Sequence, residues 1–366
     1  MESKRGSVLA LVLAGGEGGR LGPLTDERAK PALPFGGLYR LIDFPLSNCH
    51  HSGLEDVWVV QQYEPHSLSE HLANGRPWDL DRTYGGLRVV HPSTGDEHEG
   101  MFKGNADALN RAREPIAEFG AETILVVSAD AVYRLDYRDV LDAHLERGAE
   151  VTMVTTEVPR EEASRFGVVE AGRDGRVSGF AYKPDEPEGG TVTTEVFAYD
   201  AGVLLDTLAE LADEDEGLED FGHALLPRLV ERGKAWSLDL GGYWRDVGTP
   251  ASYWQGHMDL LGPEPELALD DPDWPILTRA PQLVPARIEP GAELADVLVS
   301  PGAVVRGRVE RSVLGPGAVV EAGVTVRDAV VLEHARIAAD VTRAIVDAGV
   351  EVTDAVSGGD DPEIVG

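Results

Sequence analysis

Apolar runs and amphipathic stretches alternate along residues 1–260. Continuous apolar runs, of the kind found in strands buried on both faces, occur at residues 8–13, 56–61, 123–128 and 151–155. Apolar residues with helical spacing are found at 137–147 and 251–261. This alternation predicts an α/β domain with a mixed, mostly parallel sheet and crossover helices. Ligands of such domains bind beyond the carboxyl ends of the strands, so the loops after residues 13 and 128 are candidates for a site.

The pattern changes after residue 262. Residues 263–285 are rich in Pro and Asp and have no period, which predicts a linker or an extended arm. Beyond residue 291 the chain is rich in Val, Gly and Ala, and apolar residues recur at steps of six at Leu314, Val320, Val326 and Leu332. This period predicts a parallel β-helix, with a small β-sandwich as the alternative. The expected organisation is a domain at 1–262, an arm at 263–290, a β-helix at 291–358 and a tail at 359–366.

Composition and charge exclude several classes of partner. The chain has 366 residues, with 65 acidic against 32 basic side chains and a formal net charge of −33. Such a field disfavours nucleic acid and anionic membranes, and no apolar stretch approaches the roughly 20 residues that span a bilayer. Cys49 is the only cysteine, which excludes an intrachain disulfide and a thiolate metal cluster. The short N-terminal apolar run ends in a Gly-rich turn and not in a cleavage site, so a cytoplasmic protein is expected.

A glycine-rich loop, AGGEGGRL, follows the first predicted strand at residues 14–21. Its glycines would let backbone N–H groups approach a polyphosphate, and Arg20 adds a positive charge. The loop has neither the spacing of a dinucleotide-binding fingerprint nor the Lys of a P-loop. Arg28 and Lys30 follow within ten residues and add cations suited to phosphate. The combination favours a nucleotide polyphosphate over a plain Gly-rich turn, which is the alternative.

Longer motifs carry a resemblance to a known family. The stretch LAGG-x-G-x-RL-x-PLT-x-x-RAKPA is similar to the start of the sugar-nucleotide pyrophosphorylases. FGG-x-YRLIDFPLSNC-x-x-SG at 35–53, QY-x-x-HSL-x-x-H at 62–71 and YWRDVGT at 243–249 resemble the glucose-1-phosphate adenylyltransferase branch. The resemblance implies a Rossmann-like nucleotidyltransferase domain and a left-handed parallel β-helix. It also implies that ATP and glucose 1-phosphate are converted to ADP-glucose and pyrophosphate, with Mg²⁺, for glycogen-type glucan synthesis.

The resemblance further implies roles for single residues. Asp130 and Asp246 would hold Mg²⁺, Arg20 would contact the leaving pyrophosphate, and Lys30 with Arg28 would support the triphosphate. The catalytic group would thus be Arg20, Lys30, Asp130 and Asp246. The nucleotide-binding group would be Ala14, Gly15, Gly16, Arg20, Arg28, Lys30, Gln62, Gly104 and Asp107. Within this group, Gln62 would read the base, and Gly104 and Asp107 would line the nucleoside pocket.

The sugar side departs from the family pattern. Lys183 would bind the sugar phosphate, beside Tyr182, Thr193 and Glu195. Tyr182 stands where the family usually has Glu, and Glu195 stands where it usually has Gly. Three hypotheses therefore stay open: an ADP-glucose enzyme, a pyrophosphorylase for another sugar or nucleotide, and a weakly active regulatory paralogue. A homo-oligomer, as a dimer or a tetramer, is expected from the family, alone or with a catalytic paralogue.

Overall fold

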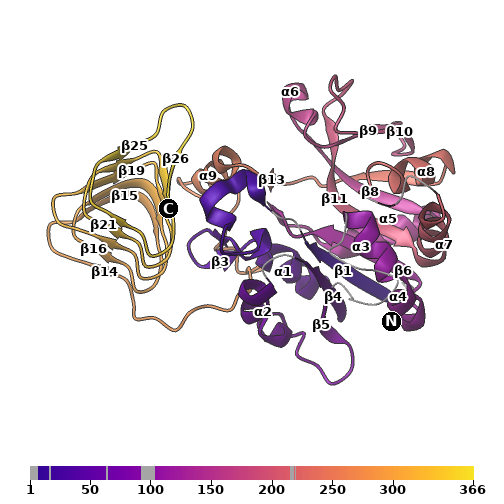
Figure 1. The fold of residues 1–366 in the computed structure, drawn as a ribbon, viewed down its shortest axis with the longest axis horizontal. Helices are drawn as coiled ribbons and strands as arrows, with labels where there is room; N and C mark the ends of the chain where they lie inside the picture. Colours follow the sequence, from indigo (N-terminus) through magenta and orange to yellow (C-terminus); the bar gives the residue numbers. More distant parts are fainter. Residues whose placement is uncertain (1–6, 16–17, 63–64, 92–103, 215–217, 219) are drawn as a thin grey trace.

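The structure is a computed structural model that describes residues 7–15, 18–62, 65–91, 104–214, 218 and 220–366. Its two parts lie side by side, an α/β domain and a β-helix of stacked strands (Figure 1). This arrangement agrees with the change of sequence pattern, from alternating apolar runs and amphipathic stretches to a period of six. In the described residues, no helix has the length and apolar character that crossing a membrane requires.

The α/β domain is built on one mixed sheet. Its strands are β1 (Val8–Ala14), β4 (Asp56–Gln61), β5 (Gly86–Val90), β6 (Thr123–Ser128), β8 (Val151–Glu157), β9 (Gly167–Ala171), β10 (Val177–Tyr182), β11 (Thr191–Asp200) and β12 (Ala235–Asp239). The strands β6, β1, β4 and β5 lie parallel in that order, whereas β11 pairs antiparallel with both β6 and β8. The expected mixed, mostly parallel sheet is confirmed.

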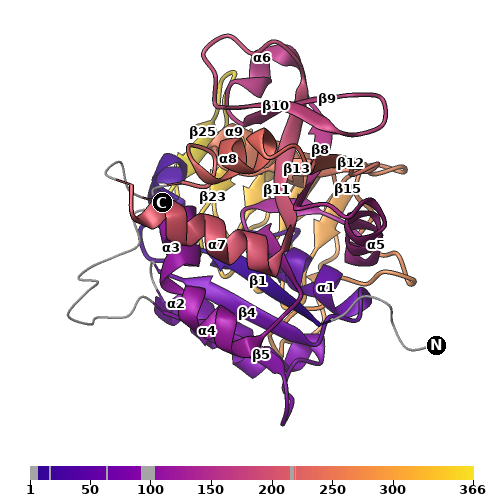
Figure 2. The same cartoon turned by 90° about the vertical axis from the view of Figure 1, so that its right-hand side faces the viewer.

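Helices cover both faces of this sheet (Figure 2). They are α1 (Asp43–His51), α2 (Pro65–Leu72), α3 (Asn105–Arg111), α4 (Arg113–Phe119), α5 (Tyr137–Arg147), α6 (Arg160–Ala163), α7 (Ala201–Ala212), α8 (Leu225–Glu231) and α9 (Pro250–Met258). Leu9 and Leu11 of β1 pack into the core under α3, α4, α7 and α8. Ala10 and Val12 pack on the opposite face, under α1, α2 and α5. Both faces of β1 are thus buried, which explains its continuous apolar run.

Local sequence explains how single helices begin. The Asp136 carboxylate accepts a hydrogen bond from the backbone N–H of Arg138 and caps α5. Thr249 and Ser252 form a capping box at the start of α9, where Pro250 occupies the first helical position. The helix expected at 251–261 therefore starts one residue earlier, and it ends at Met258. Two residues further on, Leu260 packs into the core outside the helix.

Two small strand pairs lie outside the main sheet. They are β2 (Pro34–Phe35) with β3 (Tyr39–Arg40), and β7 (Ala131–Tyr133) with β13 (Trp244–Asp246). The second pair joins segments more than a hundred residues apart and positions the site described below.

The C-terminal part is an all-parallel β-helix with three faces. One face contains β14 (Arg287–Ile288), β16 (Val304–Val305), β18 (Val319–Val320), β21 (Arg336–Ile337) and β24 (Glu351–Val352). The other two faces share β15 (Glu293–Val299) and β17 (Arg308–Leu314) and continue as β19 (Thr325–Arg327), β20 (Val330–Val331), β22 (Val341–Thr342), β23 (Ala344–Val346), β25 (Val356–Ser357) and β26 (Glu363–Val365). This is the hexapeptide-repeat architecture expected from the period of six.

The register of the β-helix explains the slips in its sequence period. Val304 pairs with Val319 and Val319 with Arg336, so successive coils take 15 and 17 residues, fewer than three full hexapeptides. Leu314, Val320 and Val326 fill its core. Leu332 instead faces the α/β domain, because the neighbouring Val331 takes the inward position.

The ends of the β-helix lie outside the expected range of 291–358. Strand β14 begins at Arg287, inside the expected arm. Strand β26 falls inside the expected tail at 359–366 and pairs with β23. The period of six did not predict these two strands, because each is very short and lies at an end of the repeat region.

The arm that links the two parts is extended and fixed to the α/β domain. The indole N–H of Trp274 donates to the side-chain oxygen of Asn48 at 3.2 Å, and that of Trp78 donates to the Leu277 carbonyl at 3.1 Å. A third apolar core then joins the two parts directly. Phe35, Tyr253 and Trp254 of the α/β domain pack there against Val330 and Ile345 of the β-helix.

Candidate active site

The predicted nucleotide loop lies at the carboxyl edge of the parallel strands. The strands β1, β4 and β6 end at Ala14, Gln61 and Ser128, and all three run in the same direction. Ala14 is buried at this edge, and a Cβ on Gly15 would lie 3.6 Å from the Cβ of Gln62. The structure therefore brings Gly15 and Gln62 together. Gly16 lies outside the described residues.

Strand pairing brings the two predicted metal ligands together. Asp246, the last residue of β13, pairs with Ala131 of β7, directly after Asp130. The ammonium of Lys30, in the turn Lys30–Ala32, lies 3.4 Å from a carboxylate oxygen of Asp130 and 3.6 Å from one of Asp246. Three residues distant in sequence thus form one charged cluster, and Lys30 is only 5% exposed within it.

The charge state of Asp130 follows from this cluster. Burial alone would raise the pKa of Asp130, but the Lys30 ammonium and the hydroxyl of Ser128 outweigh it and lower the pKa. The Ser128 hydroxyl donates to the Asp130 carboxylate at 2.7 Å. Asp130 is therefore a carboxylate at neutral pH, as a ligand of a divalent cation must be.

Two arginines complete the charged cluster. A Cβ on Gly248 would lie 2.9 Å from the Arg20 guanidinium and 3.0 Å from the Asp246 carboxylate, so Arg20 and Asp246 both crowd this glycine. Arg165 was missed by sequence reasoning. Its guanidinium lies 2.7 Å from the Asp246 carboxylate. No motif marked Arg165, and only the fold of the segment before β9 brings it to Asp246.

The residues expected to bind the sugar phosphate form a second group. The ammonium of Lys183 donates to the Tyr182 hydroxyl at 2.7 Å, and that hydroxyl donates in turn to the carboxylate of Asp220. The Tyr182 ring fills the space beside Gly222, where a Cβ would lie 2.1 Å from the ring. Asp220 was not predicted at this site, because it lies in a segment without a motif or a hydrophobic period.

Glu195 occupies a bulge in β11. The pairing of β11 with β8 moves from Thr193–Thr155 to Phe197–Met153, so three residues of β11 oppose the single Val154. Glu195 has a φ of 60°, in the left-handed region that favours glycine, which explains why the family usually has Gly there. The hydroxyl of Thr193 accepts the Glu195 N–H and is engaged in holding the bulge.

The Glu195 carboxyl belongs electrostatically to the same site. Burial raises its pKa, and the nearby carboxylates of Asp130, Asp220 and Asp246 raise it further, while Lys183 opposes the rise. The predicted sugar residues and the predicted metal ligands thus share one electrostatic environment.

Known proteins resemble the chain over most of its length. The family model described as nucleotidyl transferase matches residues 9–262, and that of the GlmU-like C-terminal hexapeptide matches residues 281–364. A glucose-1-phosphate adenylyltransferase of Thermotoga maritima is 42% identical over 88% of this chain and 77% of its own length. Proteins of the same name from Clostridium perfringens strain 13 and Desulforamulus reducens are each 39% identical, over 90% and 96% of this chain and 84% and 89% of their own lengths. The chain belongs to the glucose-1-phosphate adenylyltransferase family.

Two further residues expected at the nucleotide site lie around α3. Gly104 immediately precedes α3. Asp107 is in its first turn and forms an ion pair with Arg111 at 3.0 Å. Their expected role at the nucleoside stays a prediction.

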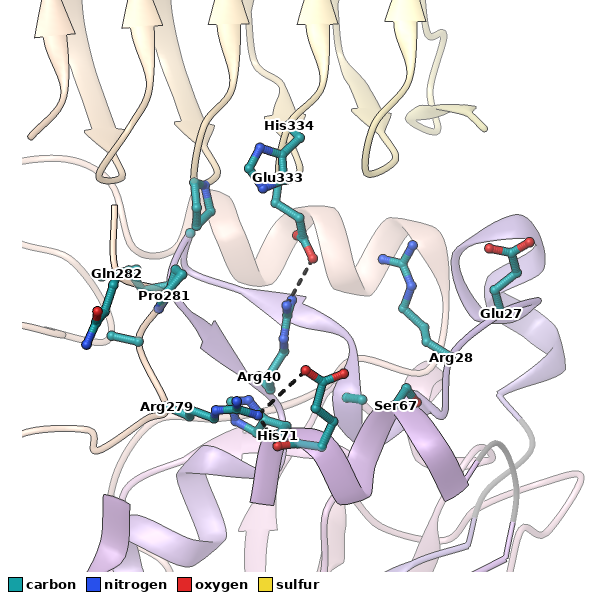
Figure 3. A pocket seen from close by; sticks show the side chains of 16 residues that line it. Glu27, Arg28, Arg40, Ser67, His71, Arg279, Pro281, Gln282, Glu333 and His334 are labelled. Carbon is teal, nitrogen blue, oxygen red and sulfur yellow. Dashed lines mark hydrogen bonds and ion pairs between the residues drawn. The ribbon is translucent and has the colours of Figure 1, made fainter. Parts of the chain in front are cut away.

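Arg28 does not contact the carboxylates that Lys30 contacts, although both residues were expected to bind triphosphate. Its guanidinium forms an ion pair with Asp347 of the β-helix at 2.9 Å, although Lys30 is only two residues away. Arg28 lines a cavity of about 840 Å³ between the α/β domain, the arm and the β-helix (Figure 3). The structure thus pairs Arg28 with the β-helix, and its expected contact with triphosphate stays a prediction.

The walls of this cavity carry charges of both signs. Arg40 pairs with Glu333 at 2.9 Å, and Arg279 pairs with Glu70 across the arm (Figure 3). Burial alone would raise the pKa of Glu333, but Arg40 and Arg28 together lower it. Arg28 and Arg40 therefore join the α/β domain to the β-helix, and Arg279 joins the arm to α2.

Replacing Arg28 tests this assignment. We expect Arg28→Met to lower the free energy of unfolding by about 1–2 kcal/mol, because Asp347 loses its partner, and to change the KM for ATP less than about threefold. Urea denaturation and pyrophosphate release would measure the two effects. Arg76→Met, which breaks the exposed pair with Asp81, is the matched control and should cost less than about 0.5 kcal/mol. If Arg28→Met raised the KM for ATP tenfold without changing the free energy of unfolding, Arg28 would instead be a nucleotide-binding residue.

Proposed function

We propose that the protein transfers the adenylyl group of ATP to glucose 1-phosphate and releases pyrophosphate. The observation that carries the proposal is the cluster of Asp130, Asp246 and Lys30 at the carboxyl edge of the sheet. The names of the relatives supply the substrates, and their identity over most of the chain supports the same reaction here.

The chemistry requires positioning and charge, with no proton to remove. An oxygen of the sugar phosphate attacks the α-phosphorus of ATP, a new P–O bond forms, and the bond to the β-phosphate oxygen breaks. Pyrophosphate leaves with the electron pair. Since charge spreads over the phosphate oxygens during such a transfer, cations around them stabilise the transition state. Lys30 and Arg20 are the groups of this chain that we assign to that task.

Mg²⁺ fits the pair Asp130 and Asp246. Both offer hard carboxylate oxygens, and the Lys30 ammonium already occupies the position of a cation between them. In the described residues no larger group of His, Cys, Asp and Glu could hold a metal, and a site of two carboxylates suits an ion that keeps water and substrate oxygens as ligands. When bound, Mg²⁺ would neutralise phosphate charge and orient the α-phosphate.

The nucleotide-binding assignment rests on the loop after β1. We place the ATP phosphates against Gly15, Arg20 and Lys30, and the base beside Gln62. The close approach of Gly15 to Gln62 supports this placement.

A pyrophosphate-release assay tests the function. The purified chain would be offered ATP, UTP, GTP and dTTP with glucose 1-phosphate and other sugar 1-phosphates, in the presence of Mg²⁺. Release with ATP and glucose 1-phosphate supports the proposal, and release only with another pair replaces it by that pair. If no pair gave pyrophosphate until a paralogous subunit was added, the chain would be a regulatory subunit. The expected homo-oligomer stays a prediction that light scattering of the purified chain would check.

A further inference from the structure

The two carboxylates of the charged cluster use their oxygens in the same way. On Asp130, Oδ1 accepts a hydrogen bond from the Ser128 hydroxyl at 2.7 Å, and Oδ2 lies 3.4 Å from the Lys30 ammonium. On Asp246, Oδ2 accepts a hydrogen bond from the Arg165 guanidinium at 2.7 Å, and Oδ1 lies 3.6 Å from the same ammonium. Each carboxylate thus has an outer oxygen, held by a neighbouring donor, and an inner oxygen, directed at Lys30.

The main sheet fixes the donor that holds Asp130. Ser128 is the last residue of β6, lies opposite Leu13 of β1 and is only 8% exposed. The backbone N–H of the next residue, Ala129, donates to the Leu13 carbonyl at 3.0 Å and continues the pairing past the end of the strand. The Ser128 hydroxyl therefore starts from rigid backbone, and its hydrogen bond restricts the rotation of the Asp130 carboxylate.

Two aromatic rings position the donor that holds Asp246. The Arg165 guanidinium lies 5.2 Å from the centre of the Phe166 ring, and this ring packs edge-on against Trp244 with the ring centres 5.3 Å apart. Trp244 and Asp246 are two residues apart in β13, so their side chains lie on the same face of the strand. The contacts from Trp244 through Phe166 and Arg165 to Asp246 therefore begin and end on β13.

The backbone that carries Arg165 is itself held in place. The N–H of Arg165 donates to the Glu162 carbonyl at 3.1 Å, and the N–H of Phe166 donates to the Ala163 carbonyl at 3.0 Å. Phe166 also packs against the small apolar cluster that contains Ala163 and Val168. The guanidinium thus reaches Asp246 from a packed turn between α6 and β9.

A divalent cation requires ligand oxygens that meet at one point. Mg²⁺ tolerates little deviation from its preferred geometry, so carboxylates that rotate freely bind it poorly. Outer groups that donate hydrogen bonds to the ligands fix their orientation, and their loss typically lowers metal affinity 10- to 100-fold. The two inner oxygens, Oδ2 of Asp130 and Oδ1 of Asp246, already meet at the Lys30 ammonium, which marks the place for a cation.

We propose that Ser128 and Arg165 are positioning residues of the cation site, which hold the outer oxygens of Asp130 and Asp246 and so direct the inner oxygens to the divalent cation. The proposal rests on the assignment of Mg²⁺ to these two carboxylates in the proposed function. If Arg165 acted only through its charge, it would repel the metal, and its removal would strengthen metal binding. The sign of the change therefore distinguishes positioning from charge.

The test measures Mn²⁺ binding to the purified chain by electron paramagnetic resonance, without nucleotide and without turnover. Arg165→Met should raise the dissociation constant about tenfold, because the lost orientation outweighs the relief from a partly exposed charge, which amounts to at most about fivefold. Ser128→Ala should also raise it about tenfold, with no change of charge. Phe166→Leu keeps the guanidinium but removes the ring beneath it, and should raise the dissociation constant about threefold.

Controls separate positioning from effects on folding and from binding elsewhere. Arg173→Met and Ser178→Ala replace an exposed arginine and an exposed serine of the β9–β10 hairpin, and should leave the dissociation constant within twofold. Asp246→Asn removes a ligand, so it should abolish binding and show that Mn²⁺ reports on this site. Thermal unfolding of each variant checks that it folds. If Arg165→Met does not fold, Phe166→Leu decides for Arg165.

The outcomes distinguish this inference from the proposed function. Equal or tighter Mn²⁺ binding by Arg165→Met overturns the role of Arg165, and unchanged binding by Ser128→Ala overturns that of Ser128. If the unmodified chain binds Mn²⁺ no better than Asp246→Asn, the inference fails together with the metal assignment. A chain that binds Mn²⁺ as expected but releases no pyrophosphate with any substrate pair overturns the proposed function and leaves the inference intact.

Discussion

Asp130→Asn should lower kcat roughly a thousandfold while leaving the fold intact. The substitution keeps the shape of the side chain and a partner for the Ser128 hydroxyl, but removes the charge that holds a divalent cation. Lys30 would keep its contact with Asp246. The loss should therefore appear in kcat and in the Mg²⁺ concentration needed for half-maximal rate, with a thermal midpoint close to that of the unmodified chain.

The control for Asp130→Asn is Asp139→Asn, which changes an exposed carboxylate in the first turn of α5. It should leave kcat within twofold. If Asp130→Asn turned over at the normal rate with the normal Mg²⁺ requirement, the metal assignment would be wrong.

Lys30→Met should lower kcat about a hundredfold and, at the same time, strengthen the binding of a divalent cation. The buried ammonium contacts both carboxylates and supplies a positive charge between them. Without it, Asp130 and Asp246 repel each other more strongly, and Mg²⁺ or Mn²⁺ no longer competes with the Lys30 ammonium. Turnover falls because the phosphates lose a cation that the metal does not replace.

Two measurements check the Lys30 prediction. Thermal unfolding with and without Mn²⁺ should show a larger stabilisation by the metal in Lys30→Met than in the unmodified chain, and pyrophosphate release should show the lower kcat. Lys234→Met removes a lysine whose side chain is 61% exposed and should change neither. Equal stabilisation by Mn²⁺ in both proteins would refute the competition between Lys30 and the metal.

The elements that the sequence predicts best are two uniformly buried strands and one capped amphipathic helix. Strands β4 and β6 and helix α5 have the predicted bounds, because continuous apolar runs and a capped amphipathic stretch leave little choice of ends. The hexapeptide period likewise predicts the β-helix. It fails at Leu332, since a short strand can present neighbouring residues to different cores.

The site could be predicted as far as its motifs extend. Asp130, Asp246 and Lys30 come together as expected. Arg28 does not, because the direction of its side chain is set by Asp347, more than three hundred residues away. Arg165 and Asp220 were missed for the same reason. Their importance comes from pairings between distant segments, which one sequence without a local motif does not reveal.

The α/β domain and the β-helix should unfold together, because they share one apolar core. This core contains Phe35, Tyr253, Trp254, Val330 and Ile345. A chain cut after residue 262 would expose the side of α9 that this core covers, including the Trp254 indole that donates to the Asp328 carbonyl at 2.7 Å. The α/β domain and the β-helix should therefore melt in a single calorimetric transition, and amide protons of α9 and β23 should exchange at the same rate. The cooperative unit of this protein is thus larger than either of the domains into which its sequence divides.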